Sequence, residues 1–197
     1  MTFVQLGLRL GNAKLAEYAS KLGFIINING SSPPALIGNA SIGQEGVLVS
    51  PMQIANLYAT LARNGLYLPT RLVSEIRNHQ GDIIQDYPRQ APERVISQET
   101  SRILKEALTR TAQNGAGRLA WIENYGTAGK TGTAQANEAK KVIAWFAGYT
   151  PVDNPRLAVA VMVEENRAGN QTGLRGGDIA APIFKEIGKR MLDLLAS

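Results

Sequence analysis

The sequence predicts an α+β fold in which an antiparallel sheet is flanked by helices. Three observations lead to this prediction: helical spacing of apolar residues through much of residues 1–126, three strand-like segments within residues 127–197, and short connections between those segments. Consecutive strands with short connections pair as antiparallel hairpins, because a parallel crossover needs about a dozen residues or more. We therefore expect a mostly helical part with one hairpin, followed by three sheet strands and a C-terminal helix.

The N-terminal residues predict two helices. Apolar residues recur over residues 3–10, and Asn12 is expected to cap a second helix over residues 13–22 that Gly23 ends. The first pattern begins without a cap or linker, which is the expectation for a chain cut from a longer one. Residues 24–47 are expected to be irregular, because they are rich in Asn, Ser, Gly and Pro.

The next segment contains a strong helix start. Ser50 fits the N-cap, Pro51 the first helical position and Gln53 the partner position of a capping box, and Asn64-Gly65 should end this helix. Residues 66–87 are expected to form a β-hairpin whose turn holds His79 in solvent. Ser97 should then cap a helix over residues 98–111.

The last third should contain the sheet and one more helix. Asn137–Lys140 is expected to be a turn, and a Gly-rich loop, Gly169–Gly177, should lead into a helix over residues 178–195. The three expected strands are Thr127–Gln135, Val142–Tyr149 and Arg156–Glu164.

Composition excludes several classes of site. The 197 residues carry 21 Lys+Arg and 16 Asp+Glu, a net charge of +5, and 44% of them are hydrophobic. The absence of cysteine and the single histidine exclude a thiol nucleophile, a Cys-ligated zinc site and a metal site built from several histidines. The basic residues are dispersed, which does not favour nucleic acid as a partner. No apolar run approaches the roughly 20 residues that span a bilayer.

The segment Gly126–Gln135 carries the candidate chemistry. It lacks the glycine spacing and the following helix of a phosphate-binding loop, and it is expected to be a strand. Alternation then places Thr131 and Thr133 on one face and Lys130 and Gly132 on the other. Gly132 leaves room for a close approach, Lys130 supplies a cation, and a strand edge offers free N–H groups. The pattern suits a peptide that ends in a carboxylate, with a backbone N–H as a possible oxyanion donor.

Six stretches of the sequence together carry a family resemblance: Thr2–Gly7, Ile42–Gln44, Ser50–Ala55, Leu61–Gly65, Gly129–Ala134 and Ala144–Pro151. In this order they resemble the transpeptidase domain of penicillin-binding proteins, and they are closer to the monofunctional class B enzymes than to stand-alone β-lactamases. The resemblance covers nearly the whole chain. It implies a β-lactamase/transpeptidase-like fold with a helical subdomain, of which residues 1–197 would be the C-terminal portion, with no metal or other cofactor.

Two family motifs are missing from the sequence. None of the nine serines is followed by lysine at the third position, and no Ser-x-Asn occurs. The resemblance implies that both motifs lie N-terminal to Met1. The chain is therefore expected to lack the nucleophile, to be inactive alone, and to be stable only with the N-terminal half of the same protein, as a separate or nicked chain.

The resemblance also implies roles for the strand motif. The family transfers an acyl group from a D-Ala-D-Ala stem peptide through a serine ester during peptidoglycan cross-linking, and β-lactams stall it. Lys130 would assist proton transfer and attract the substrate carboxylate, the hydroxyls of Thr131 and Thr133 would bind that carboxylate, and Gly132 would admit the substrate. The Thr133 N–H would form half of the oxyanion hole. The family lies at the extracytoplasmic face of the bacterial membrane, held by an anchor not seen in this chain.

Other functions remain open at this point. The chain could belong to a non-catalytic sensor module that binds penicillin or peptide through Lys130–Thr133, or to a serine β-lactamase relative. A binder of anionic polymers is a third interpretation. The side chains of Trp145 and Phe146 are expected to pack in the sheet rather than to take part in chemistry.

Overall fold

A three-stranded antiparallel sheet lies at the centre of the structure, a computed structural model that describes residues 2–136, 141–166 and 175–196. The strands are β7 (Ala128–Ala136), β8 (Lys141–Thr150) and β9 (Leu157–Asn166), in the order β7-β8-β9. Their register places Thr131 opposite Phe146 and Phe146 opposite Val161. The three predicted strands and their antiparallel pairing are confirmed, whereas the predicted turn at 137–140 lies outside the described residues.

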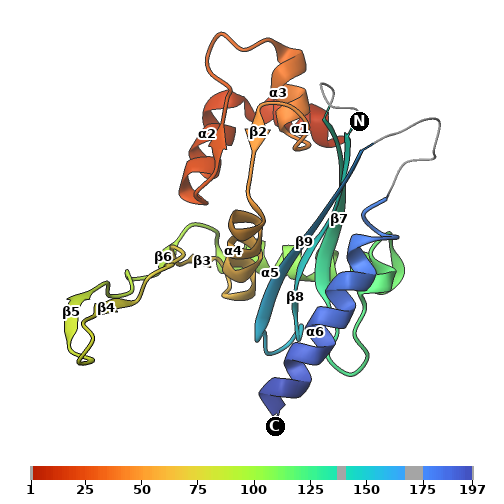
Figure 1. The fold of residues 1–197 in the computed structure, drawn as a ribbon. Helices are drawn as coiled ribbons and strands as arrows, with labels where there is room; N and C mark the ends of the chain where they lie inside the picture. Colours follow the sequence, from red (N-terminus) through yellow and green to blue (C-terminus); the bar gives the residue numbers. More distant parts are fainter. Residues whose placement is uncertain (1, 137–140, 167–174, 197) are drawn as a thin grey trace.

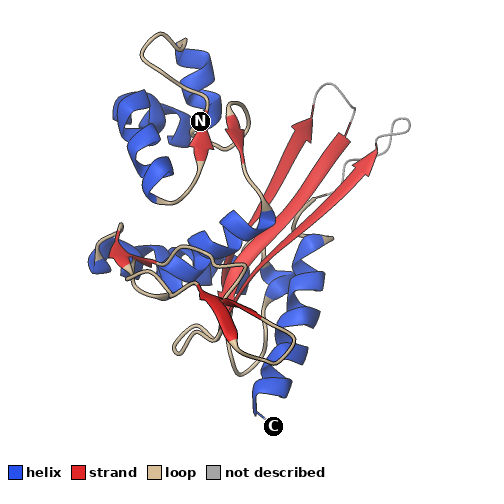
Figure 2. Ribbon diagram, turned by 60° about the vertical axis from the view of Figure 1, so that its left-hand side comes forward, coloured by secondary structure: helices blue, strands red, loops and turns tan. Residues whose placement is uncertain are grey.

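Helices cover both faces of this sheet (Figure 2). α6 (Ala180–Ala196) packs on one face, where Phe184 and Phe146 are fully buried with ring centroids 4.8 Å apart. α4 (Pro51–Ala62) and α5 (Gln98–Asn114) pack on the other face, where Tyr58 and Tyr149 are buried. Successive residues of a strand point to opposite faces, so the two halves of the core alternate along β8.

The start of α4 has the predicted capping box. The Ser50 hydroxyl accepts a hydrogen bond from the Gln53 N–H at 3.2 Å, and the Gln53 side chain accepts one from the Ser50 N–H at 2.8 Å. Gln53 also donates to the Gly23 carbonyl at 2.7 Å. The helix ends as predicted, with Asn64 and Gly65 at positive φ (55° and 87°). Local sequence therefore fixes both ends of this helix.

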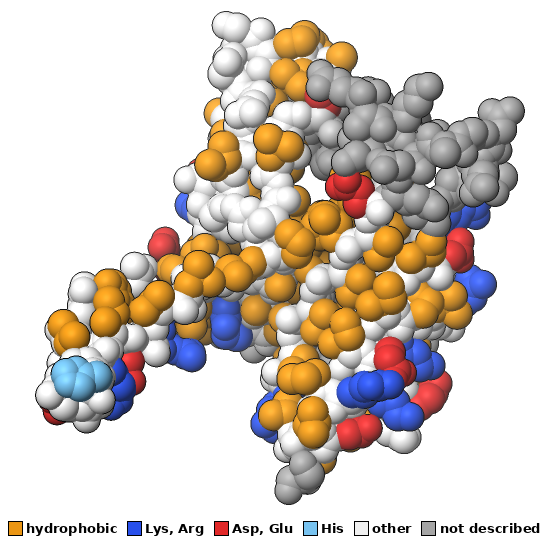
Figure 3. Space-filling view, viewed as in Figure 1, with side chains coloured by type: hydrophobic (Ala, Val, Ile, Leu, Met, Phe, Trp, Pro, Cys, Tyr) orange, Lys and Arg blue, Asp and Glu red, His pale blue; other side chains and the backbone are white. Residues whose placement is uncertain are grey.

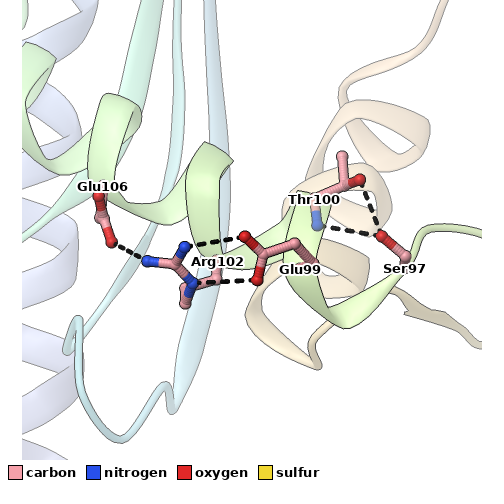
Figure 4. A network of polar contacts seen from close by, with 5 residues as sticks. All are labelled: Ser97, Glu99, Thr100, Arg102 and Glu106. Carbon is pink, nitrogen blue, oxygen red and sulfur yellow. Dashed lines mark hydrogen bonds and ion pairs between the residues drawn. The ribbon is translucent and has the colours of Figure 1, made fainter.

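The start of α5 is also as predicted, with Ser97 as its cap (Figure 4). Its hydroxyl accepts from the Thr100 N–H at 3.0 Å. On the exposed side, Arg102 donates to Glu99 at 2.9 Å, which lowers the pKa of Glu99, and it also donates to Glu106 at 2.6 Å. Solvent screens exposed pairs of this kind, so they stabilise the helix only slightly. The helix runs to Asn114, one turn beyond the predicted end.

A β-hairpin arm, made of β4 (Glu75–Arg77), β5 (Ile83–Asp86) and their turn, projects from the body (Figure 1). His79 lies exposed in that turn at the tip of the arm, as predicted (Figure 3). The predicted hairpin over 66–87 is wrong at its start. Here β3 (Leu66–Tyr67) pairs with β6 (Glu93–Arg94) instead, a pairing between distant residues that no local pattern specifies.

The N-terminal region contains α1 (Thr2–Leu10), α2 (Asn12–Lys21) and α3 (Pro34–Ala40), with a two-stranded pair formed by β1 (Ile25–Ile26) and β2 (Val47–Leu48). The prediction of Asn12 as a cap is wrong, because Gly11 at φ 80° takes that position and makes no side-chain bond. Gly23 at φ 75° follows the end of α2, as predicted. The expectation of an irregular segment missed α3, which begins with Pro34 at its first position.

Candidate functional site

A groove of about 300 Å³ lies between the edge of β7 and the helix α4. The predicted residues Lys130, Thr131, Gly132 and Thr133 all line it. The opposite wall comes from α4 and from the N-terminal region, and it is mainly apolar. The apolar residues that line this opposite wall include Phe24, Ile42, Val47, Val49, Ile54, Leu57 and Tyr58.

The alternation predicted for β7 is present. Lys130 and Gly132 are opposite Ala147 and Trp145, on the side of the sheet that faces α4. A β-carbon at Gly132 would lie 3.3 Å from that of Trp145, closer than most real contacts, so glycine keeps this part of the groove open.

The two threonines point to the opposite face, toward the chain just before α6. The Thr133 hydroxyl accepts a hydrogen bond from the Gly176 N–H at 3.3 Å, and the Thr131 methyl lies beside Gly177. Because β7 is an edge strand, both threonines also reach the rim of the groove. Most of the predicted Gly-rich loop, residues 167–174, lies outside the described residues.

The open edge of β7 carries backbone groups that could bind a ligand. The Thr131 carbonyl accepts from Lys130 Nζ at 2.9 Å, and the Thr133 carbonyl accepts from Gln44 Nε2 at 3.1 Å, so both carbonyls point away from β8. In an antiparallel strand the N–H and C=O of one residue point the same way. The Thr133 N–H therefore faces the groove edge as a donor, where a developing negative charge could be stabilised.

The electrostatics of the groove rest on one ammonium group. Among the described lining residues, Lys130 is the only charged one. Its side chain is exposed, and its Nζ lies 3.4 Å from the Thr131 hydroxyl. Tyr58 on the far wall is buried, which raises the pKa of its phenol and keeps it neutral at physiological pH. An elongated ligand with one anionic end fits this distribution of charge.

Gln44 and Trp145 are two of the lining residues that were not singled out for the site from the sequence. Gln44 reaches the Thr133 carbonyl from 89 positions away along the chain, a contact that spacing alone does not indicate. The signal available was the stretch Ile42–Gln44, one of those that resemble the transpeptidases. Phe146 is buried as predicted, whereas Trp145 is half-buried and lines the groove.

Several kinds of site are not found in the described residues. They contain no group of three or more His, Cys, Asp or Glu side chains placed to hold a metal ion. No serine is among the residues that line the groove. None of the helices that the structure describes combines the length and apolar character needed to cross a membrane.

The sequence is similar to known transpeptidases along most of its length. A family model, "Penicillin binding protein transpeptidase domain", matches residues 1–189. Stage V sporulation protein D of Bacillus subtilis is 34% identical over 204 residues, which cover 94% of this chain and 31% of that protein. Peptidoglycan D,D-transpeptidase PbpA of Mycolicibacterium smegmatis is 29% identical, with 92% of this chain and 39% of that protein covered.

Solved structures have the same fold. Penicillin-binding protein A from M. tuberculosis, solved as an imipenem acyl-enzyme complex, superposes with a TM-score of 0.80 at 27% identity. The match covers 96% of this chain and 45% of that one. The chain therefore spans about a third of the length of these curated relatives and less than half of the solved protein.

Proposed function

Because the chain belongs to the penicillin-binding protein transpeptidase family, we propose that it supplies the Lys-Thr-Gly wall of a D,D-transpeptidase site. The observation that carries the proposal is the groove along β7, where Lys130 and the outward-facing Thr133 N–H line one wall. The groove has a cation and a backbone donor but no serine among its lining residues. The nucleophile and its base are proposed to come from an N-terminal half of the same protein.

The proposed reaction is acyl transfer in two steps. A serine oxygen from the N-terminal half attacks the carbonyl carbon of the penultimate D-Ala, and the peptide C–N bond breaks as the terminal D-Ala leaves with a proton on its amine. An amine of a neighbouring peptidoglycan strand then attacks the ester carbonyl and displaces the serine oxygen. The acceptor amine loses one proton in this step, and the serine regains one.

The residues of β7 take separate parts in this scheme. The Thr133 N–H donates to the oxyanion that forms in both steps. Lys130 and the hydroxyls of Thr131 and Thr133 hold the terminal carboxylate of the stem peptide, and Lys130 assists proton transfer. Gly132 allows the extended peptide to lie along the edge strand. A β-lactam enters the same groove and remains as the serine ester. The site is proposed to face the outside of the bacterial membrane.

The exposed apolar surface of the chain supports the proposal that a second polypeptide segment packs against it. On α1, Phe3 is 72% exposed and Leu10 is 52% exposed. On the other side of the molecule, Leu194 of α6 is 70% exposed, and apolar side chains form a band along this helix in Figure 3. Surfaces of this kind are unfavourable in water, which is consistent with an N-terminal half that completes both the domain and the site.

Labelling with a fluorescent penicillin tests the proposal. The protein is resolved on a denaturing gel and the labelled species is identified by intact mass. We expect the label on a second chain, or on a segment that precedes these residues in a longer protein. No label in the complete domain would contradict the proposed transpeptidase activity and favour a non-catalytic module. Label on this chain itself would contradict the proposal that the nucleophile comes from the N-terminal half. Rapid loss of the label by hydrolysis would instead identify a β-lactamase relative.

A charge variant tests the role of Lys130 within the same assay. Lys130→Gln should lower the rate of labelling by roughly a hundredfold, because it removes the cation that faces the carboxylate. Lys189→Gln on α6 removes the same charge from an exposed position outside the groove and should leave the rate unchanged. Equal rates in the two variants would contradict the proposed role of Lys130.

A further inference from the structure

A second cavity, of about 370 Å³, lies on a different side of α4 from the groove. Helix α4 contributes Asn56 and the adjoining Arg63, and the chain leading into and out of the arm contributes Arg71 and Arg89. Three of the nine residues that line this cavity are therefore arginines, and none is acidic. Basic side chains are visible where the arm joins the body in Figure 3.

The three guanidinium groups are not neutralised by neighbouring carboxylates. None of them forms an ion pair with a residue in the described part of the chain. Burial and the nearby Arg89 lower the pKa of Arg63, which means that the two positive charges repel one another. Repulsion between like charges is relieved when an anion binds between them.

Backbone and amide contacts hold two of the arginines in place. Arg63 donates to the Leu66 carbonyl at 3.2 Å and lies 3.5 Å from the Asn56 side-chain oxygen. Asn56 is buried and donates in turn to the Leu68 carbonyl at 3.0 Å. Arg71 donates to the Tyr87 carbonyl at 2.6 Å. Each guanidinium has five N–H donors, so most donors of the cluster remain available to a ligand.

From this cluster we infer a second binding site, one that takes a phosphate group at the base of the arm. A phosphate monoester carries a charge of about −1.5 to −2 and three acceptor oxygens, whereas a carboxylate carries −1 and two oxygens. Three separate guanidinium groups match the phosphate better in charge and in number of donors. The proposal does not depend on the transpeptidase activity, because Arg71 and Arg89 do not line the groove.

Titration calorimetry of the protein with its complete transpeptidase domain tests the site, with inorganic phosphate as the probe. The double variant Arg71→Gln/Arg89→Gln should bind phosphate at least about tenfold more weakly. The matched control Arg110→Gln/Arg118→Gln removes two exposed charges outside the cavity and should bind as the parent does. Equal loss in both double variants would show an adventitious ion only and overturn the proposal.

Two further experiments identify the ligand. Acetate at the same ionic strength should compete poorly, and competition as strong as that of phosphate would overturn the preference for phosphate. Vesicles of phosphatidylcholine with and without phosphatidic acid, whose phosphate is a monoester, distinguish the source. Retention that depends on phosphatidic acid and on Arg71 and Arg89 assigns the site to a lipid headgroup. Phosphate binding without such retention assigns it to a soluble phosphate. An unchanged unfolding midpoint in the double variant shows that the fold is intact.

Discussion

The sheet region, residues 127–196, and the N-terminal region, residues 2–48, use their apolar residues in opposite ways. In the sheet region, Phe146, Tyr149 and Phe184 are at most 1% exposed. In the N-terminal region, Phe3, Ile25 and Leu48 are 72–76% exposed. The sheet is covered on one face by α6 and on the other by α4 and α5, whereas the N-terminal region directs these large apolar side chains into solvent. Burial of a large apolar side chain stabilises a fold by about 1.5–3 kcal/mol, so the sheet region should account for most of the chain's stability.

The largest expected effect is in the core of the sheet region. Phe184→Ala should lower the free energy of unfolding by about 3–5 kcal/mol, because it removes a fully buried ring that packs edge-on against Phe146. Denaturant unfolding of the complete domain measures this change. A loss under about 1 kcal/mol would mean that α6 does not hold the sheet as described.

The space around glycines also differs between the sheet region and the N-terminal region. A β-carbon at Gly148 would lie 2.5 Å from the Ala128 carbonyl oxygen, so Gly148→Ala should cost about 1–3 kcal/mol as the sheet shifts to make room. Gly30 in the N-terminal region has nothing within 4 Å of that position, so Gly30→Ala serves as the matched control. Equal midpoints of unfolding for the two variants would contradict the close packing of β7 on β8.

The exposed face of α1 tests whether the N-terminal region is covered in the complete protein. If the proposed N-terminal half packs there, Phe3→Ala in the complete domain should cost about 1–2 kcal/mol. Ile84→Ala on the arm, where the side chain is 67% exposed, should change stability little. A Phe3→Ala variant as stable as Ile84→Ala would show that α1 stays open to solvent and would argue against that contact.

The sequence predicted the features that depend on neighbouring residues. The capping box at Ser50, the cap at Ser97 and the three sheet strands were all expected, because caps and alternation are local signals. The same reasoning grouped Lys130 with Gly132 and Thr131 with Thr133 on opposite faces of β7, as the structure has them.

Features that depend on contacts between distant residues could not be predicted from the sequence. The pairing of Leu66–Tyr67 with Glu93–Arg94 and the bond from Gln44 to Thr133 join segments whose local patterns carry no information about one another. Helix α3 was missed for another reason, since the proline before it and the proline, glycine and asparagine within it favour turns in isolation. The arginine cavity likewise forms only where the chain leading into and out of the arm lies beside α4, so single exposed arginines gave no signal.

The smallest expected effect concerns an exposed carboxylate of the N-terminal region. Glu17 on α2 accepts from Lys14 at 2.8 Å and from Lys21 at 2.7 Å, and these contacts lower its pKa from 4.5 to about 2. The folded pKa lies below the unfolded one, so the stabilisation is complete above pH 4.5 and is lost as the pH falls toward 2. Solvent screens an exposed pair of this kind, so the effect on unfolding should be small.

The Glu17 carboxylate can be followed directly. An NMR titration of its side-chain carboxyl should give a midpoint well below 4.5, and Lys14→Gln/Lys21→Gln should return it toward that value. In unfolding measurements, Glu17→Gln should differ from the parent at pH 6 and converge with it as the pH approaches 2. A midpoint near 4.5 in the parent would mean that the two lysines spend little time against Glu17. Helix α2 would then be held by backbone hydrogen bonds and packing alone. The N-terminal region would contribute even less to the stability of the chain, relative to the sheet region, than the two ion pairs suggest.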